Sequence, residues 1–378
     1  MPPVPVPRKV SRILGIRMGH IGDVVLVTPA IELLHTMFPS ATVSMLVRKG
    51  TEPVLSHHPG VQRVFSSGEI VSQQKMHVQT RSTLRQRLAK IPRGFDVVGM
   101  LRREKFDLAV DFTSGDRSAI MAFMSGAPIR VGHAARGTGF AGRDGLYTHL
   151  SRVSEIGLHK VVKDAELLRD AAIATGRPHL AERGVLVPGP LSMNVTAMDE
   201  TWARTRWGML SMSGQKRVVV HPTSRVRYKC WPAERWHDVI DRLVGEHNVS
   251  VVVTSGPDVD EIAFAQRVAG GIKGVHVHGG DLTLGTLSAL IKDADLFMGV
   301  DTAPMHVAAA VGTRVVAVFG PSDDRVWGPW GKGHVVVRAQ CSCLASGKRG
   351  CDENEGMQCL RAVSADAVYA AATGVLAL

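Results

Sequence analysis

The segment GVDTAPMHVAAAVGTRVVAVFGPSDDRVWGPWG, residues Gly299 to Gly331, decides the fold of this chain. The apolar run Leu296 to Val300 is long enough for a buried strand, and a helix is predicted to begin at Asp301, at the carboxyl end of that strand. Thr302 is suited to cap the helix, and Pro304 is suited to its first turn. Open parallel sheets bind ligands at this edge, where free N–H groups of a helix suit a diphosphate. The sequence therefore predicts a phosphate site at this corner.

Strands and helices alternate through both halves of the chain, which predicts an α/β protein with parallel sheets covered by helices on both faces. Predicted strands in the first half are Ile13 to Ile16, Thr42 to Val47 and Phe106 to Phe112. Those in the second half are Arg217 to Val220, Val249 to Thr254, Leu296 to Val300 and Arg314 to Phe319, with helices beginning near Pro232, Asp258 and Thr283.

The length of 378 residues predicts two domains, because it exceeds what one hydrophobic core usually supports. The segment Val185 to Ser192, VLVPGPLS, has the proline and glycine content of a hinge. We therefore expect a first domain over residues 1–187 and a second over residues 188–363. Residues 364–378 have the apolar spacing of a further helix, with Ser364 as its cap.

The formal net charge of +11 favours a polyanionic partner, either nucleic acid, an anionic membrane surface or a phosphorylated substrate. The alternative is a soluble protein that is merely basic. Only 5% of the residues are aromatic and no recognition motif is present, so binding of nucleic acid by base stacking is not expected. The basic stretch Gln73 to Arg93 is predicted to be an exposed helix, and a solvated charged face is its preferred interpretation.

A cytoplasmic location is expected from the absence of membrane and export signals. No stretch approaches the ~18 to 20 consecutive apolar residues that span a bilayer. The proline-rich start MPPVPVPRKV lacks the apolar core of a signal peptide. Five cysteines in a chain of this size do not make a disulfide framework, which agrees with a reducing compartment.

Asp23 is the candidate general base of the first half. It falls in the first turn of a predicted helix that starts at Gly22, where the helix dipole keeps a carboxylate ionised and able to accept a proton. The alternative is that Asp23 only caps the helix. Pro29 is expected to kink this helix. The string GHIGD lacks the G-x-G-x-x-G spacing of a dinucleotide site, which argues against an oxidoreductase.

A second candidate phosphate site follows the strand Arg217 to Val220. The hydroxyls of Thr223 and Ser224, together with the ammonium group of Lys229, are predicted to form a cradle for phosphate. Arg225 and Arg227 are further candidates. The alternative is that Lys229 is an ordinary surface lysine preceding a helix.

These segments together resemble glycosyltransferase family 9, the bacterial lipopolysaccharide heptosyltransferases. The resemblance is carried in order by IGDVVLVTPAIELLHTMFPSA, VRKGTEPVL, VVHPTSRVRYKCWPAERW and GVDTAPMHVAAAVGTRVVAVFGPSD. The heptosyltransferase III subgroup is the most similar, because it also carries a tail like CSCLASGKRGCDENEGMQCL. Several motifs in the right order make the match specific.

The resemblance implies a GT-B fold, in which two Rossmann-like doubly wound domains face an interdomain cleft. It implies that Asp23 is the base and that Thr223, Ser224 and Lys229 bind donor phosphate. Asp301, Thr302, Ala303 and His306 match the segment that contacts heptose and diphosphate. His20 and Gly22 are acceptor-side candidates, although the residues before Gly22 depart from other branches and leave acceptor contacts unassigned. For His306, an alternative is a packed structural histidine.

The resemblance further implies an inverting transfer of heptose from ADP-heptose to the lipopolysaccharide inner core, with no metal or other cofactor. The anionic acceptor lies at the inner membrane, so the enzyme is expected to be peripheral on its cytoplasmic face. The tail helix is expected to cross back to the first domain, as in other GT-B enzymes. The rival functions are a nucleotide-sugar isomerase or epimerase of the same architecture and a basic nucleic-acid-binding protein.

The cysteine-rich tail offers a possible metal site. Its thiols follow the pattern C-x-C-x₇-C-x₇-C, formed by Cys341, Cys343, Cys351 and Cys359. Four clustered thiols can bind zinc, but the usual paired C-x₂₋₄-C spacing is absent. Metal-free thiols, or a pair oxidised on isolation, are therefore the preferred interpretation.

Overall fold

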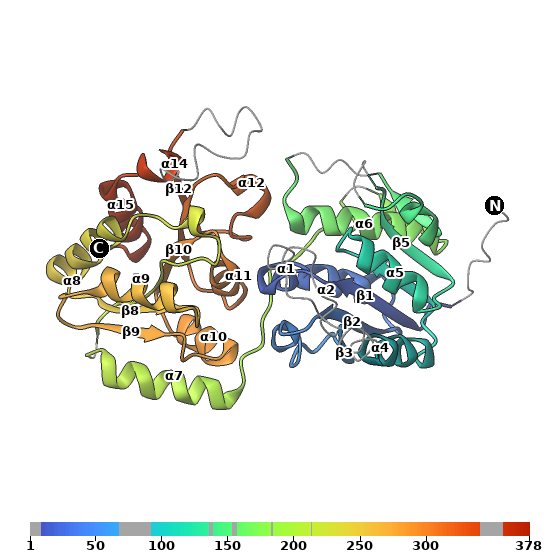
Figure 1. Cartoon of the computed structure of the whole chain (residues 1–378), viewed down its shortest axis with the longest axis horizontal. Coiled ribbons are helices and arrows are strands. Elements are labelled where there is room, and N and C mark those ends of the chain that lie inside the picture. Colours follow the sequence, from blue (N-terminus) through green and yellow to red (C-terminus); the bar gives the residue numbers. More distant parts are fainter. Residues whose placement is uncertain are drawn as a thin grey trace, which may run out of the picture. The chain divides into compact units, whose positions relative to one another are not determined.

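The chain divides into two compact units, Met1–Gly189 and Pro190–Leu378, each built around a parallel six-stranded sheet. The computed structural model, shown in Figure 1, describes residues 9–67, 92–135, 139–152, 157–182, 184–212, 214–340 and 358–378, with only the backbone for residues 92–96. Most of the basic stretch Gln73 to Arg93 lies outside these residues. None of the helices in the described ranges is long and apolar enough to cross a bilayer.

The first unit has the strand order β3-β2-β1-β4-β5-β6. Its strands are β1 Arg12–Arg17, β2 Thr42–Arg48, β3 Arg63–Ser67, β4 Leu108–Asp111, β5 Ile129–His133 and β6 His149–Ser151. Its helices are α1 Ile21–Leu26, α2 Thr28–Met37, α4 Pro92–Arg103, α5 Asp116–Met124 and α6 Lys160–Ala174, with short 3₁₀ turns η1 Glu52–Val54, η3 Arg143–Leu146 and η4 Pro178–Ala181.

The second unit repeats this order as β12-β11-β10-β7-β8-β9. Its strands are β7 Arg217–His221, β8 Ser250–Ser255, β9 Val275–Gly279, β10 Leu296–Val300, β11 Val315–Phe319 and β12 Val335–Arg338. Its helices are α7 Ala197–Leu210, α8 Ala233–His247, α9 Val259–Ala269, α10 Leu284–Lys292, α11 Ala303–Ala310, α12 Asp324–Trp327, α14 Gln358–Arg361 and α15 Ala365–Leu376, with the 3₁₀ turn η5 Arg227–Lys229.

Both sheets have the strand order of a Rossmann fold, so each has one point where the order reverses. In the first unit this point lies between β1 and β4, which pair in parallel with Ile16 opposite Asp111. In the second it lies between β7 and β10, with Gly299 opposite His221. Ligands of such sheets bind outside the carboxyl ends of the strands at this point. The fold therefore marks one candidate ligand edge in each unit.

The inner strands of the second sheet are buried on both faces, as expected for parallel strands rich in valine. All six residues of β8, SVVVTS, are buried. On one face, α8, α9 and α15 share a core with alternate strand residues, in which the rings of Trp231 and Trp236 pack edge to face, with centroids 5.0 Å apart. Helix α7 packs on α10, where the buried Trp207 of α7 donates a hydrogen bond from Nε1 to the carbonyl of Leu290 in α10 at 3.1 Å.

Two predicted helix starts need correction. The expected kink at Pro29 is a full break, because α1 ends at Leu26 and Pro29 lies in the first turn of the separate helix α2. The helix after β10 begins at Ala303 rather than Asp301. Thr302 occupies its N-cap position, but its hydroxyl makes no capping hydrogen bond to any described residue. Asp301 therefore lies in the turn, outside the helix.

The tail helix also differs from the expectation. The resemblance predicted that residues 364–378 cross back to the first domain, but α15 packs on the core of the second unit. Its buried side chains, Val368, Ala372, Val375 and Leu376, join residues of α8 and β10 in one cluster. The predicted cap is confirmed, because Ser364 Oγ accepts a hydrogen bond from the Ala367 N–H at 3.2 Å.

Candidate active site

The close approach of β7 and β10 brings the two predicted phosphate segments to one corner. Gly299 permits this approach, since a Cβ atom there would lie 2.9 Å from the backbone oxygen of His221. The turn that begins at Pro222 and the turn that contains Asp301 both leave the sheet at this edge. The residues that the sequence assigned to the donor phosphate therefore start from neighbouring strands.

Lys229 and Asp301 meet at this corner in an ion pair. Lys229 Nζ lies 2.6 Å from Asp301 Oδ2, and the two side chains are 24% and 8% exposed. The Asp301 side chain is buried in the turn after β10, whereas the Lys229 side chain, which extends from η5, is partly exposed to solvent. The ion pair with a strand-end carboxylate gives Lys229 a defined position at this corner. It sets a positive charge beside the N-terminus of α11, where an anion is favoured.

The hydroxyls of Thr223 and Ser224 already take part in hydrogen bonds within the protein. Thr223 Oγ1 donates to Glu261 Oε2 at 2.8 Å, and Ser224 Oγ accepts from the Val226 N–H at 3.2 Å. Glu261 lies in α9 and also accepts a hydrogen bond from the Gly256 N–H at 3.3 Å. The carboxylate therefore fixes the orientation of the Thr223 side chain.

His221 extends this network into the core. Its Nδ1 lies 2.9 Å from Thr254 Oγ1, and its Nε2 lies 3.4 Å from Thr223 Oγ1. Complete burial lowers the pKa of His221 to about 4. The imidazole is therefore neutral at physiological pH, and it stabilises the base of the turn through hydrogen bonds rather than charge.

This buried imidazole predicts an acid-sensitive fold. The unfolded chain protonates His221 near the ordinary value of 6.5 while the folded chain stays neutral to about pH 4, so the unfolded state binds more protons between these values. Stability is therefore lost as the pH falls through this window. Between pH 7 and pH 5 we expect a loss of about 2 kcal/mol from this side chain. Urea unfolding at both pH values should show a smaller loss in His221→Gln, and an equal loss in both proteins would contradict it.

The remaining donor-side candidates lie at the start of α11. Ala303 is the first residue of the helix, directly after Thr302. His306 is in the same helix and is only 4% exposed. Its burial agrees with the alternative of a packed structural histidine.

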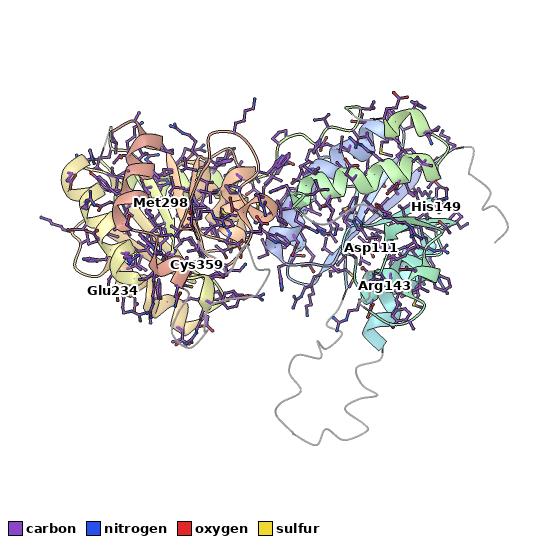
Figure 2. All side chains as sticks on the ribbon, turned by 90° about the horizontal axis from the view of Figure 1, so that it is seen from above. Asp111, Arg143, His149, Glu234, Met298 and Cys359 are labelled. Atoms are coloured by element: carbon purple, nitrogen blue, oxygen red, sulfur yellow. The ribbon has the colours of Figure 1, made fainter. Side chains whose placement is uncertain are left out.

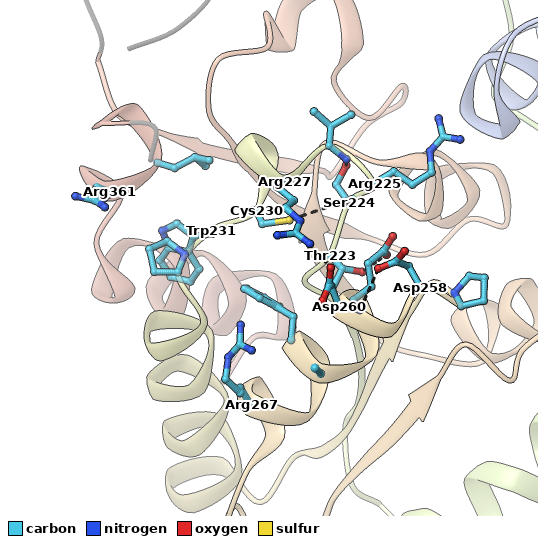
Figure 3. A pocket seen from close by; sticks show the side chains of 17 residues that line it. Thr223, Ser224, Arg225, Arg227, Cys230, Trp231, Asp258, Asp260, Arg267 and Arg361 are labelled. Carbon is cyan, nitrogen blue, oxygen red and sulfur yellow. Dashed lines mark hydrogen bonds and ion pairs between the residues drawn. The ribbon is translucent and has the colours of Figure 1, made fainter. Parts of the chain in front are cut away.

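A pocket of about 930 Å³ adjoins the corner on the side of β8 and α9. Figure 3 shows the side chains around it, with Thr223 and Ser224 on the strand-end turn, Asp258 and Asp260 at the start of α9, and Arg227 across from them. Arg227 forms an ion pair with Asp260. Lys229 and Asp301 do not line this pocket.

In the first unit, Asp23 lies in α1, directly beyond the carboxyl end of β1. Its Oδ2 accepts a hydrogen bond from the His20 N–H at 2.9 Å, so Asp23 does cap its own helix. Gly19 allows this arrangement, because a Cβ atom there would lie 2.5 Å from the same oxygen. The side chain remains half-buried. Capping uses one carboxylate oxygen and leaves the second available for a proton.

The two acceptor-side candidates differ in exposure. His20 is exposed, and its Nδ1 lies 3.1 Å from Arg48 Nη1. Gly22 is buried in the first turn of α1. Of these two residues, only His20 therefore presents a side chain to solvent beside Asp23.

A family model decides the affiliation of the chain. The model described as glycosyltransferase family 9 (heptosyltransferase) matches residues 96–356. The chain belongs to glycosyltransferase family 9. It is accordingly a glycosyltransferase, as the motifs predicted.

Individual relatives agree with this affiliation. The chain is 30% identical over 316 residues to lipopolysaccharide heptosyltransferase 3 of Escherichia coli, an alignment that covers 83% of this chain and 84% of the relative. A family 9 glycosyl transferase from Veillonella parvula has a similar structure, with a TM-score of 0.77, 20% identity and 98% of each chain covered. The E. coli heptosyltransferase WaaC with ADP superposes with a TM-score of 0.67, 20% identity and coverage of 96% of this chain and 99% of that one. The predicted GT-B fold is confirmed.

This family 9 glycosyltransferase holds a charged cluster behind Asp23 that the sequence did not reveal. Arg17, at the end of β1, donates from Nε to the Asp23 carbonyl at 3.0 Å and pairs with Asp164 at 2.9 Å. Both side chains of the pair are almost fully buried. Burial, together with the positive charge of Arg17, lowers the pKa of nearby Lys160 to about 8. Asp164 lies 141 residues and Lys160 lies 137 residues beyond Asp23, so no local pattern joins them to it.

Most of the predicted thiol cluster is outside the described ranges. This holds for Cys341, Cys343 and Cys351, whereas Cys359 is buried in the core of the second unit. Within the described residues, no group of three or more His, Cys, Asp or Glu side chains is placed to hold a metal ion. Burial raises the pKa of the Cys230 thiol, which packs beside the Ser224 carbonyl.

Proposed function

We propose that this enzyme transfers heptose from ADP-heptose to a sugar of the lipopolysaccharide inner core, with inversion at the anomeric carbon. The observation that carries the proposal is the Lys229–Asp301 pair at the point where the order of the second sheet reverses. This is where such a sheet receives a nucleotide diphosphate. WaaC with ADP, which shares the fold, and the similarity to lipopolysaccharide heptosyltransferase 3 support the choice of donor and acceptor.

In the proposed reaction, Asp23 removes the proton from an acceptor hydroxyl as the oxygen attacks the anomeric carbon. The new C–O bond forms while the bond to the diphosphate breaks, and ADP leaves with the electron pair. Lys229 and the N-terminal turn of α11, at Thr302 and Ala303, stabilise the charge that develops on the leaving group. One displacement inverts the configuration. The proposal requires Asp23 to reach the acceptor hydroxyl while that oxygen lies against the anomeric carbon of the bound donor.

We assign supporting roles to the residues around Lys229. Thr223, which Glu261 and His221 hold in place, and Ser224 present the turn after β7 to the donor phosphate. Asp301 orients the lysine and contacts the heptose hydroxyls, with His306 behind it. His20 and Gly22 flank the base on the acceptor side. In this proposal the reaction uses no metal ion.

We further propose that the enzyme works at the cytoplasmic face of the inner membrane. The net charge of +11 supports this location, because basic proteins are attracted to anionic lipids and to phosphorylated acceptors.

The direct test incubates the purified protein with ADP-heptose and truncated lipopolysaccharide cores, followed by mass spectrometry. We expect one acceptor species to gain the mass of one heptose residue, and NMR of the product to show the inverted anomeric configuration. ADP-heptose alone is the control, because an isomerase or epimerase would change the donor without any acceptor. Absence of the mass gain with every core offered would contradict the proposed function.

A further inference from the structure

Three buried polar atoms without hydrogen-bond partners lie at the turn that follows β4 and on the neighbouring η3. Ser114 Oγ, Asp116 Oδ1 and Arg143 Nε make no hydrogen bond in the described part of the chain. Buried polar atoms are normally paired, so a cluster of unpaired ones needs an explanation. The three residues come from two segments, because Ser114 and Asp116 lie around the start of α5 and Arg143 begins η3.

The three side chains form one cluster. Arg143 is only 3% exposed, and its Nη1 donates to the Ser114 carbonyl at 3.0 Å. The same nitrogen lies 3.9 Å from Asp116 Oδ1, beyond hydrogen-bonding distance. Figure 2 shows Arg143 in the first unit in the same region as Asp111, the last residue of β4. The Asp116 side chain is 43% exposed as a whole, so the turn borders solvent, although the three unpaired atoms themselves are covered.

The backbone of this turn is unusual as well. Ser114 has a φ of +63°, in the left-handed region where residues other than glycine are disfavoured. Glycine would adopt this conformation at less cost, yet the chain has a residue with a hydroxyl. The Ser114 hydroxyl therefore sits on a backbone conformation that glycine would adopt more easily, and it makes no hydrogen bond in the described residues.

The location is the ligand edge of the first sheet. β4 is the neighbour of β1 where the strand order reverses. The Met18 N–H donates to Thr113 Oγ1 at 2.8 Å, which ties this turn to the residues that lead into α1 and Asp23. A ligand on the turn would therefore lie at the same edge as the proposed base.

The chemistry of the unpaired atoms selects the ligand. They supply a charged donor from Arg143, a charged acceptor from Asp116 and a hydroxyl that does either. A phosphate or carboxylate would gain the guanidinium but would meet the carboxylate of Asp116. Two neighbouring sugar hydroxyls fit better, since one can accept from Arg143 and donate to Asp116 while the other bonds Ser114.

We propose that the turn from Thr113 to Asp116, together with Arg143, binds hydroxyl groups of the acceptor sugar. This assignment rests on the proposed function, because it places the acceptor at the edge that carries Asp23. It gives the first unit a defined sugar subsite beside the base. The acceptor chain then runs from this turn towards α1.

The test is titration calorimetry of the full-length protein with oligosaccharides released from truncated lipopolysaccharide cores, without any donor. We expect Asp116→Asn to weaken the affinity about ten- to a hundredfold, the range for a hydrogen bond to a charged group. Ser114→Gly should weaken it about threefold or more and still fold, because glycine suits the left-handed backbone. Asp366→Asn, which changes an exposed first-turn acid of α15, is the matched control and should bind like the wild type.

Two outcomes would overturn the subsite. One is equal affinity in the wild type, Asp116→Asn and Ser114→Gly, and the other is competition by inorganic phosphate, which would reveal an anion site. Oligosaccharides that bind neither the wild type nor the variants also count against it. ADP affinity is measured in the same samples and should not change. A failure to bind ADP would count against the proposed function, independently of the subsite.

Discussion

Asp23→Asn is expected to lower the rate of heptosyl transfer about 10²- to 10⁴-fold, the usual cost of losing a general base. Asparagine has nearly the same shape as aspartate, and its side-chain oxygen can still accept the hydrogen bond from the His20 N–H. It cannot take a proton from the acceptor. The rate constant should be measured in single turnovers with both substrates bound, and ADP affinity should remain within about twofold of the wild type.

Asp23→Ala separates the two roles of this carboxylate. Alanine removes both the base and the cap, so it should lower the rate like asparagine and also lower the free energy of unfolding by about 1 kcal/mol. Urea unfolding of all three proteins measures the second effect. If Asp23 serves only as a cap, Asp23→Asn will transfer heptose nearly as fast as the wild type, and the assignment as base is then wrong.

Many strands were predictable because a short run of apolar residues between polar turns is enough to indicate a buried strand. Runs such as Leu296 to Val300 consist of apolar residues between polar turns, and this run is β10 without any shift in its bounds. Helix N-caps also depend on neighbouring residues alone. The side chains of Asp258, Thr283 and Ser364 each accept a hydrogen bond from a backbone N–H in the first turn of their own helix. Periodicity predicted β1, β2 and β4 of the first sheet and β7, β8, β10 and β11 of the second, whereas the strands β3, β5, β6, β9 and β12 were not predicted.

Helix starts at the ligand edge were less predictable. Asp301 has the side chain of a good cap, yet the helix begins two residues later and Asp301 turns to Lys229 instead. Tertiary contact outweighed the local preference here, since pairing with the lysine offsets the burial of the carboxylate. The tail helix shows the same limit, because the apolar face of α15 is visible in the sequence but the surface that covers it is not.

The contacts that complete the candidate sites join residues far apart in the chain. Glu261 is 38 residues from Thr223, and in the sequence it looks like an ordinary acid in the first turn of α9. Arg143 belongs to no motif, and its position against Ser114 follows from the packing of η3 on α5. The sequence therefore predicted the strand ends that carry the chemistry, but the partners on them required the folded structure.

Lys229→Met is expected to weaken ADP binding about ten- to a hundredfold, the range for losing a charge-assisted hydrogen bond to phosphate. The variant also leaves the carboxylate of Asp301 buried without its partner at the corner where the diphosphate is proposed to bind. Repulsion between the two negative charges should add to the loss. Calorimetric titration with ADP measures the total effect, and adenosine is the control because it lacks the phosphates. Adenosine affinity should be the same in the variant and the wild type.

The double variant Lys229→Met/Asp301→Asn distinguishes phosphate binding from a purely structural ion pair. Replacing both partners removes the unpaired carboxylate, so the double variant should regain most of the stability lost in Lys229→Met. Its ADP affinity should stay low, because the charge that attracts the diphosphate is still missing. An ADP affinity restored to the wild-type value in the double variant would show that Lys229 only neutralises Asp301. The leaving group would then depend on the helix N-terminus of α11 alone for its stabilisation.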